Sequence, residues 1–174
     1  MKREDFPILN EQVHGRKLVY LDNAATTQKP QVVMDAMTEA YSKWNANVHR
    51  GVHHLSQVAT QNHEEARKKV ARLLHAQSEE EIIFTKGTTD SINMLARSFG
   101  DAMVGEGDEI IISQLEHHSN IVPWQMLCER KNAVLKVIPL RKDLSLDVEA
   151  FKGLLSERTQ LVSMTHMNNV LSIV

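Results

Sequence analysis

The sequence predicts an α/β fold with a mostly parallel sheet and flanking helices. In the second half of the chain, short apolar runs alternate with longer segments of helical periodicity, which is typical of parallel strands joined by crossover helices. The segment Ile110-Ile111-Ile112 is apolar at every position, as in strands that are buried on both faces. We therefore expect the sheet to organise the chain after about residue 75.

Composition excludes several classes of function. The chain has 174 residues, 42% of them hydrophobic, a length that suits one domain or part of a larger one. A net charge of −2 without a dense basic run gives no electrostatic case for a nucleic-acid partner. The start turns acidic where a secretion signal would turn apolar, and no apolar run approaches the ~20 residues of a membrane span. With a single cysteine, no internal disulfide can form. We expect a cytoplasmic protein without a membrane partner.

Residues 1–75 are predicted to be mostly helical, with loops between the helices. Residues 22–27 have the composition of a turn, and Pro30 stands where a helix would begin. The apolar stripe of that helix is Val33, Met37, Ala40 and Trp44. Residues 45–54 are loop-like, and Ser56 is expected to cap a second helix that runs to Leu73.

Residues 76–174 are predicted to form the sheet and its helices. The expected strands are 81–85, 109–113, 134–138 and 161–165, and the expected helices are 90–103, 121–131 and 147–155, the last capped by Asp147. After the last strand, residues 166–174 contain no crossover helix and no capping residue. We therefore expect the chain to be a piece of a longer protein.

Polar residues follow three of the predicted strands. These are Thr88 and Thr89 at the head of a helix, the segment 114–120 with adjacent His117 and His118, and a third segment with His166 and Asn169. In open α/β sheets, ligands bind beyond the carboxyl ends of the strands. We expect the three segments to converge on one cleft.

Each of these segments also has a simpler explanation. The threonines and the helix start could bind a phosphate, or Thr89 or Asp90 could only cap the helix. The histidine pair beside a carboxylate could act as acid or base, bind a metal, stack on a planar ligand, or lie in a solvated loop. Asn168-Asn169 could form only a turn.

Two further groups were considered. His49, Arg50, His53 and His54 cluster in the first loop. A metal site needs three or four converging ligands of fixed geometry, so we predict no metal there, and Arg50 could hold an anion instead. Cys128 lies on an apolar helix face without an activating neighbour and is expected to be a buried structural residue.

Five segments resemble a known family. In order along the chain they are Leu21–Thr26, Arg50–Leu55, Phe84–Asp90, Glu116–Gln125 and Thr165–Leu171. Together they closely resemble the first part of a SufS-type cysteine desulfurase, a pyridoxal 5'-phosphate enzyme of the class V aminotransferase group. The resemblance runs from about residue 6 to the end. The Glu-His-His segment and the Arg-Gly-x-His-x-Leu segment are its most specific parts.

The resemblance implies a fold and residue roles. Residues 1–75 would be a helical segment with active-site loops, and 76–174 the first part of the cofactor-binding domain of a fold type I transferase. The implied roles are cofactor phosphate binding for Thr88 and Thr89, ring stacking and catalysis for His117, cofactor and substrate contact for Asn169, and a substrate pocket for Ala24, Ala25, His49 and Arg50. Ser172 departs from the glycine that is usual in the family.

The resemblance also implies an activity. The full-length enzyme would convert L-cysteine to L-alanine, leave a persulfide on its own cysteine, and supply sulfur for iron–sulfur cluster assembly. It would be a homodimer with a SufE- or SufU-like sulfur acceptor. The family's Schiff-base lysine, its aspartate and its catalytic cysteine lie beyond Val174, so we expect the 174 residues alone to be inactive. The alternatives are another class V enzyme, of selenocysteine lyase or kynureninase type, and a non-enzymatic truncated product that acts as a binding module.

Overall fold

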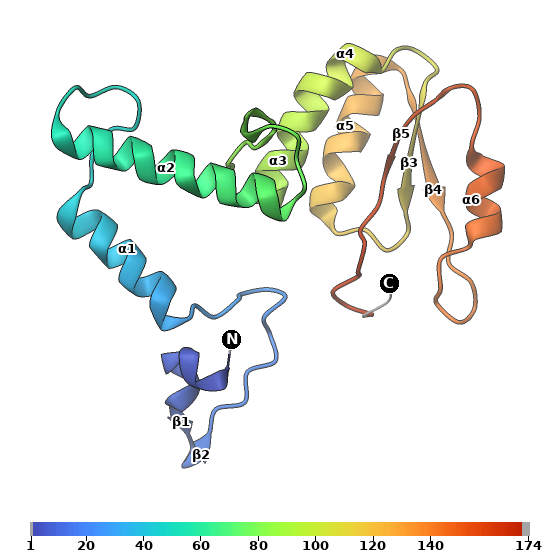
Figure 1. Cartoon of the computed structure of the whole chain (residues 1–174). Coiled ribbons are helices and arrows are strands. Elements are labelled where there is room, and N and C mark those ends of the chain that lie inside the picture. The colour runs from blue at the N-terminus through green and yellow to red at the C-terminus, as the bar shows by residue number, and fades with distance from the viewer. Residues whose placement is uncertain (1, 172–174) are drawn as a thin grey trace. The chain divides into compact units, whose positions relative to one another are not determined.

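The computed structural model describes residues 2–171 of the chain (Figure 1). The chain divides into two compact units, Met1–Ile83 and Phe84–Val174, and each is described here by itself. Ser172, the position that departs from the family pattern, lies outside the described residues. Within the described range, no helix combines the length and the apolar character needed to cross a bilayer.

The first unit contains two longer helices and several short elements. In chain order these are η1 (Arg3–Asp5), η2 (Pro7–Asn10), β1 (Gln12–Val13), β2 (Arg16–Lys17), α1 (Gln31–Lys43), α2 (His54–Leu73) and η3 (Glu79–Glu81). Helix α1 begins directly after Pro30, as predicted. The small β1–β2 hairpin was not predicted, and its turn consists of His14 and Gly15, both at positive φ. Positive φ at both central residues is the mark of the tight turns that join such hairpins.

The expected cap of α2 is wrong. The helix begins at His54, and the side chain of His53 accepts a hydrogen bond from the backbone N–H of Ser56 at 3.4 Å. The hydroxyl of Ser56 is instead used by the preceding loop, because it donates to the carbonyl of Asn47 at 2.6 Å and accepts from the N–H of Gly51 at 3.0 Å. Ser56 thus holds the loop against the helix.

The second unit contains the parallel sheet. Its elements are α3 (Thr88–Leu95), the π-helical turn η4 (Ala96–Gly100), α4 (Asp101–Met103), β3 (Glu109–Ser113), η5 (His118–Asn120), α5 (Val122–Lys131), β4 (Val134–Ile138), α6 (Val148–Leu154) and β5 (Thr159–Ser163). The strands lie in the order β4-β3-β5, and β3 pairs with both neighbours in parallel. Figure 1 shows α5 and α6 on opposite sides of this sheet. The predicted α/β fold is confirmed.

Two predicted strands match the sheet and a third is displaced. The strands expected at 109–113 and 134–138 are found at those positions. The strand expected at 161–165 spans Thr159–Ser163 instead. Its pairing with β3 ends at Ser163, and the N–H of Thr165 donates to the carboxylate of Glu116 at 2.8 Å rather than to a strand.

The strand expected at 81–85 is wrong. Residue 81 ends the 3-10 turn η3, and residues 82–85 join no sheet in the described part of the chain. Ile82 has extended backbone angles (φ −97°, ψ 117°), as its β-branched side chain favours. A strand is defined by the ladder of a neighbouring strand, which the apolar composition of Ile82-Ile83-Phe84 does not supply.

The core of the second unit lies between the sheet and α5. Its buried members are Ala96, Val104, Ile110, Ile112, Trp124, Leu127 and Cys128. Ile110 and Ile112 face α5, whereas Ile111 alternates to the other face of β3 and is also fully buried. Burial of each of these large apolar side chains contributes ~1.5–3 kcal/mol. This core fixes the strand ends that position the candidate site.

Asp147 is the predicted cap of α6, and its loss should be measurable. Its carboxylate accepts a hydrogen bond from the N–H of Ala150 at 3.0 Å. We expect D147A to lower the free energy of unfolding by about 1 kcal/mol in urea titrations, because a helix N–H loses its partner. D147N retains the acceptor and should stay within a few tenths of wild type. Equal losses in both variants would contradict a capping role.

Candidate functional site

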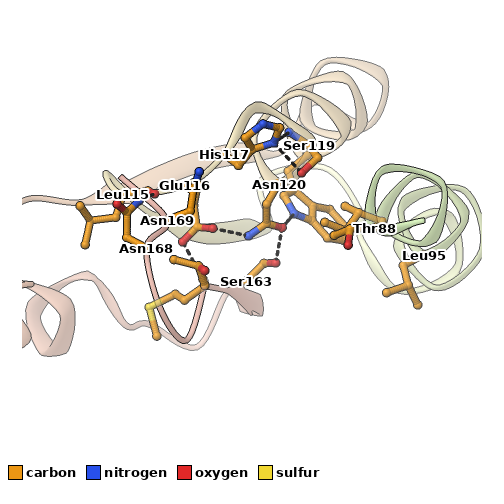
Figure 2. Close-up of a pocket in the computed structure, with 14 residues that line it drawn as sticks. Thr88, Leu95, Leu115, Glu116, His117, Ser119, Asn120, Ser163, Asn168 and Asn169 are labelled. Atoms are coloured by element: carbon orange, nitrogen blue, oxygen red, sulfur yellow. Dashed lines mark hydrogen bonds between the residues drawn. The ribbon is translucent and has the colours of Figure 1, made fainter. Parts of the chain in front are cut away.

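A cleft lies at the carboxyl edge of the sheet. The crossover from β3 to β4 runs one way and the next crossover returns past β3 to β5, so the strand order reverses beside β3. Ligands in open α/β sheets bind at such reversal points. The cleft encloses about 270 Å³ and is lined by the start of α3, the loop after β3 and the segment after β5 (Figure 2). Its volume lies near the lower end of the ~300–1,000 Å³ of small-molecule sites.

The cleft brings together three of the residues selected from the sequence. Thr88, His117 and Asn169 all line it, so the predicted convergence of the three segments is observed. The first segment follows extended backbone rather than a strand. Thr89 lines a neighbouring hollow together with His117. His166 does not line the cleft.

The start of α3 leaves hydrogen-bond donors free. Gly87 precedes the helix at φ +150° and ψ 179°, a conformation that is essentially restricted to glycine. The first helical hydrogen bond runs from the N–H of Ser91 to the carbonyl of Gly87 at 3.0 Å. Within residues 2–171, the hydroxyls and backbone N–H groups of Thr88 and Thr89 have no acceptor. These donors and the helix dipole suit an anion.

Asp90 takes part in the same turn without blocking it. Its carboxylate accepts a hydrogen bond from the N–H of Lys86 at 3.2 Å, which closes the turn before the helix. The alternative in which Thr89 or Asp90 only caps the helix is not observed, because Gly87 is the N-cap residue and α3 has no side-chain cap hydrogen bond. The two threonines remain available for a ligand.

The contacts of His117 select one tautomer of the neutral ring. Its Nδ1 accepts a hydrogen bond from the backbone N–H of Ser119 at 3.1 Å and lies 2.9 Å from the Ser119 hydroxyl (Figure 2). Because a backbone N–H can only donate, Nδ1 is the acceptor of the neutral imidazole and Nε2 carries its proton. The ring of His118 meets that of His117 edge to face, with centroids 5.9 Å apart. The exposed face of His117 can stack on a planar ligand.

The two adjacent asparagines have different tasks. Asn168 is buried; its amide donates to the carbonyl of Leu115 at 2.6 Å, and its oxygen accepts from the N–H groups of Val170 and Leu171. Asn169 is exposed, lines the cleft and has no side-chain hydrogen bond within the described chain. The turn interpretation therefore fits Asn168, and the ligand interpretation fits Asn169.

The residues predicted to form a substrate pocket belong to the first unit. Ala24 and Ala25 lie in the turn at 22–27, which is closed by a hydrogen bond from the N–H of Thr26 to the carbonyl of Asp22. His49 has a positive φ of 64°, and its backbone N–H donates to Thr60 on α2 at 2.9 Å. Arg50 is exposed. Their role in a pocket stays a prediction.

His49 also belongs to an ion-pair network that the sequence analysis missed. Its Nε2 lies 2.9 Å from the carboxylate of Glu64, and candidate ligand atoms of His49, His63 and Glu64 lie within 4.8 Å of one another. Arg67 already brings a cation there, because its guanidinium lies 3.3 Å from His63 and 3.8 Å from Glu64. We describe this cluster as an ion-pair network and propose no metal for it. His53, expected in the same loop cluster, caps α2 instead.

Cys128 is buried in the core of the second unit, as expected. Burial raises the pKa of its thiol, which disfavours the thiolate. A thiol in this environment is a poor nucleophile.

Comparison with known proteins identifies the family. The sequence profile described as Aminotransferase class-V matches residues 19–174, so the chain belongs to the class-V aminotransferase family. The chain is 51% identical over 168 residues to a probable cysteine desulfurase from Staphylococcus aureus strain Mu50, covering 97% of this chain and 41% of that protein. The predicted family membership is confirmed.

Solved structures agree with this assignment. The apo cysteine desulfurase from Thermococcus onnurineus NA1 matches with a TM-score of 0.87 and 39% identity, over 98% of this chain and 41% of that one. The cysteine desulfurase CsdA from Escherichia coli matches with a TM-score of 0.83 and 39% identity, with the same coverage of 98% and 41%. The chain therefore spans about two fifths of the length of the proteins that it matches.

Proposed function

We propose that the protein is a pyridoxal-phosphate-dependent cysteine desulfurase, which releases L-alanine from L-cysteine and transfers the sulfur onward. The observation that supports this most is the convergence of Thr88, His117 and Asn169 on one cleft at the reversal point of the sheet. The 51% identity to a probable cysteine desulfurase favours this member of the family over others.

The residues present fit pyridoxal phosphate. The free N–H and hydroxyl groups at the head of α3 suit the phosphate, and the open space beside Gly87 leaves room for it, since a Cβ there would meet nothing within 4 Å. The face of His117 suits the pyridine ring, and the amide of Asn169 suits a ring hydroxyl or a carboxylate. When bound, the cofactor supplies an electron sink for bonds to the substrate's α-carbon.

The chain's own residues then bind and orient. Thr88 and Thr89 would hold the phosphate end. His117 would cover one face of the ring, and its Nε2–H would be the group that moves a proton at the site. Asn169 would bind the substrate or the ring edge. Ala24, Ala25, His49 and Arg50 are proposed to take part in substrate binding.

The physiological context follows the same resemblance. The Glu-His-His and Arg-Gly-x-His-x-Leu segments support a SufS-type enzyme, which is a cytoplasmic homodimer that supplies sulfur for iron–sulfur clusters through a SufE- or SufU-like acceptor. We propose this partner class and these two segment boundaries, 1–75 for the helical part with active-site loops and 76–174 for the cofactor domain, as part of the same function.

The 174 residues alone are proposed to be inactive. Sulfur transfer needs a reactive thiolate, and the chain's one cysteine, Cys128, is buried with a raised pKa. The chain also spans only 41% of the matched relatives. Purified 174-residue protein with L-cysteine and pyridoxal phosphate should form no alanine above the background of free cofactor, and sustained alanine formation would contradict this.

The proposed activity is tested with the protein as its gene encodes it in full. Purified protein is incubated with pyridoxal phosphate, the reductant dithiothreitol, which releases persulfide sulfur as sulfide, and L-cysteine, L-selenocysteine or L-kynurenine, and alanine and sulfide are measured. We expect alanine and sulfide in equal amounts from cysteine, with the highest kcat/KM for this substrate. Preference for selenocysteine or kynurenine would replace the desulfurase by another class V enzyme. No turnover of any of the three would favour a binding module.

The phosphate site gives a second prediction. We expect T88V and T89V each to weaken pyridoxal phosphate binding about tenfold or more, because a hydrogen bond to a charged group contributes ~1.5–3 kcal/mol. Valine retains the shape and removes only the hydroxyl. T38V, on the exposed surface of α1, is the matched control and should bind as wild type does. Titration of the cofactor by its absorbance measures the affinity, and unchanged binding in both site variants would place the phosphate elsewhere.

A further inference from the structure

Hydrogen bonds join the loop after β3 to the segment after β5 at the cleft. Three side-chain contacts make this connection: Ser163 Oγ to Asn120 Oδ1 at 2.6 Å, Thr165 N to Glu116 Oε1 at 2.8 Å, and Asn168 Nδ2 to the carbonyl of Leu115 at 2.6 Å. The two connected segments carry His117 and Asn169. The relative position of His117 and Asn169 thus depends on the side chains of Glu116 and Asn120, to which no role has been assigned so far.

Asn120 can adopt only one amide orientation. Its oxygen accepts hydrogen bonds from the indole N–H of Trp124 at 2.8 Å and from the hydroxyl of Ser163, and its nitrogen donates to Glu116 Oε2 at 2.8 Å (Figure 2). Because an indole N–H can only donate, the oxygen must face Trp124. Asn120 is buried, so a reversed amide would leave a donor without an acceptor.

Glu116 matches this orientation as an acceptor of three hydrogen bonds. Besides the Asn120 amide, its carboxylate accepts from the hydroxyl of Ser113 at 2.5 Å and from the N–H of Thr165 at 2.8 Å. A glutamine at this position could not satisfy all three donors. In one orientation its amide nitrogen would face the nitrogen of Asn120, and in the other it would face the N–H of Thr165.

We propose that Glu116 and Asn120 are a pair of positioning residues that hold His117 opposite Asn169 across the cleft. His117 follows Glu116 directly and lies in the same loop as Asn120. Asn169 follows Ser163 and Thr165, to which the two residues are hydrogen-bonded. The carboxylate of Glu116 is occupied by donors of the chain itself, so it acts through its neighbours and not on a ligand. The roles of His117 and Asn169 in this statement rest on the proposed function.

The donor and acceptor roles of residues 116 and 120 can be exchanged without a change in side-chain shape. E116Q alone places two donors face to face, and N120D alone places two carboxylates face to face. The double variant E116Q/N120D restores one donor and one acceptor: the introduced carboxylate accepts from Trp124, Ser163 and the introduced amide, whose oxygen accepts from Ser113 and Thr165. The comparison of the four proteins therefore separates the hydrogen-bond pattern from side-chain size.

The indole N–H of Trp124 donates to Asn120, so its signal reports this hydrogen-bond pattern even without a cofactor. In nitrogen-15 correlation spectra of the protein as its gene encodes it, we expect the Trp124 signal and the His117 imidazole signal to shift or broaden in E116Q and in N120D, and to return toward wild type in the double variant. Pyridoxal phosphate affinity should fall about tenfold or more in each single variant, because E116Q leaves a buried donor unsatisfied and N120D opposes two carboxylates, and should recover in the double variant. The matched control is E157Q, because Glu157 is exposed and has no side-chain hydrogen bond among residues 2–171.

The outcomes distinguish this inference from the proposed function. Wild-type spectra in E116Q, or a double variant no better than either single one, would overturn the positioning pair. A single variant that unfolds leaves the double variant as the decisive protein, since a folded, cofactor-binding double variant supports the pair and an unfolded one contradicts it. If wild type binds no pyridoxal phosphate, the proposed function fails. The Trp124 and His117 signals still decide whether Glu116 and Asn120 position the loop that carries His117.

Discussion

H117A in the full gene product is expected to lower kcat for alanine release by about 100-fold, in the range of a lost acid–base group. Pyridoxal phosphate affinity should fall as well, because the ring loses its stacking partner. The fold should persist, since the His117 ring is exposed and its polar contacts are with Ser119 in its own loop. Steady-state kinetics, cofactor titration and circular dichroism measure the three effects.

His118 supplies the control for this experiment. It neighbours His117, is also exposed, and does not line the cleft, although it lines the neighbouring hollow with Thr89. H118A should keep its affinity for the cofactor and most of its turnover. Equal losses in H117A and H118A would indicate a general loosening of the loop, and wild-type kinetics in H117A would remove it from the mechanism.

G87A is expected to destabilise the start of α3 by about 1–3 kcal/mol, because alanine is strained at φ +150°. Relief of that strain would move the N–H groups of Thr88 and Thr89, so cofactor affinity should fall further than in either threonine variant. The effect comes from the backbone alone, since a Cβ at Gly87 would meet no atom within 4 Å.

Gly153 makes the contrast clear. A Cβ there would also meet nothing within 4 Å, but Gly153 lies inside helix α6 without a positive φ. G153A should therefore stabilise the protein by roughly 0.5–1 kcal/mol, the usual gain of alanine over glycine in a helix. Urea titrations measure the free energy of unfolding, which should fall in G87A and rise in G153A. A stable G87A protein with unchanged cofactor affinity would show that the turn tolerates a side chain.

Local sequence patterns predicted the elements whose signal lies in their own residues. The apolar run Ile110-Ile111-Ile112 predicts a doubly buried strand, and the pairing of β3 with β4 on one side and β5 on the other provides that burial. Asp147 predicts a helix start because its acceptor lies three residues from the N–H that it caps. Residues 82–85 have the same composition as a strand, yet their state depends on a partner strand that local sequence does not specify.

The candidate site was predictable where polar residues follow strand ends. His117 and Asn169 follow β3 and β5, as that rule requires, whereas Thr88 follows extended backbone that joins no sheet in the described chain. Glu116 and Asn120 were not assigned a role, because their partners Thr165 and Ser163 are more than forty residues away in the sequence. A carboxylate and an amide that flank a selected histidine were the available signal, but only the fold tells which donors they meet.

The loops of the first unit were harder to predict from the sequence. His49 and His53 were expected in one loop cluster, but they act separately, since His49 contacts Glu64 and His53 caps α2. His49 also has a positive φ, which its sequence neighbours do not predict. Ser56 was expected to cap α2, but its hydroxyl is hydrogen-bonded to Asn47 and Gly51 in the preceding loop.

The measurement that tests the central claim most directly is a crystal structure of the full gene product with pyridoxal phosphate. The account predicts the phosphate at the N-terminus of α3 against Thr88 and Thr89, the ring under the face of His117, and Asn169 at the ring or substrate edge. The hydrogen bond between Glu116 and Asn120 should be retained beside the bound ring. A cofactor bound away from the cleft, or with its phosphate remote from α3, would contradict the account.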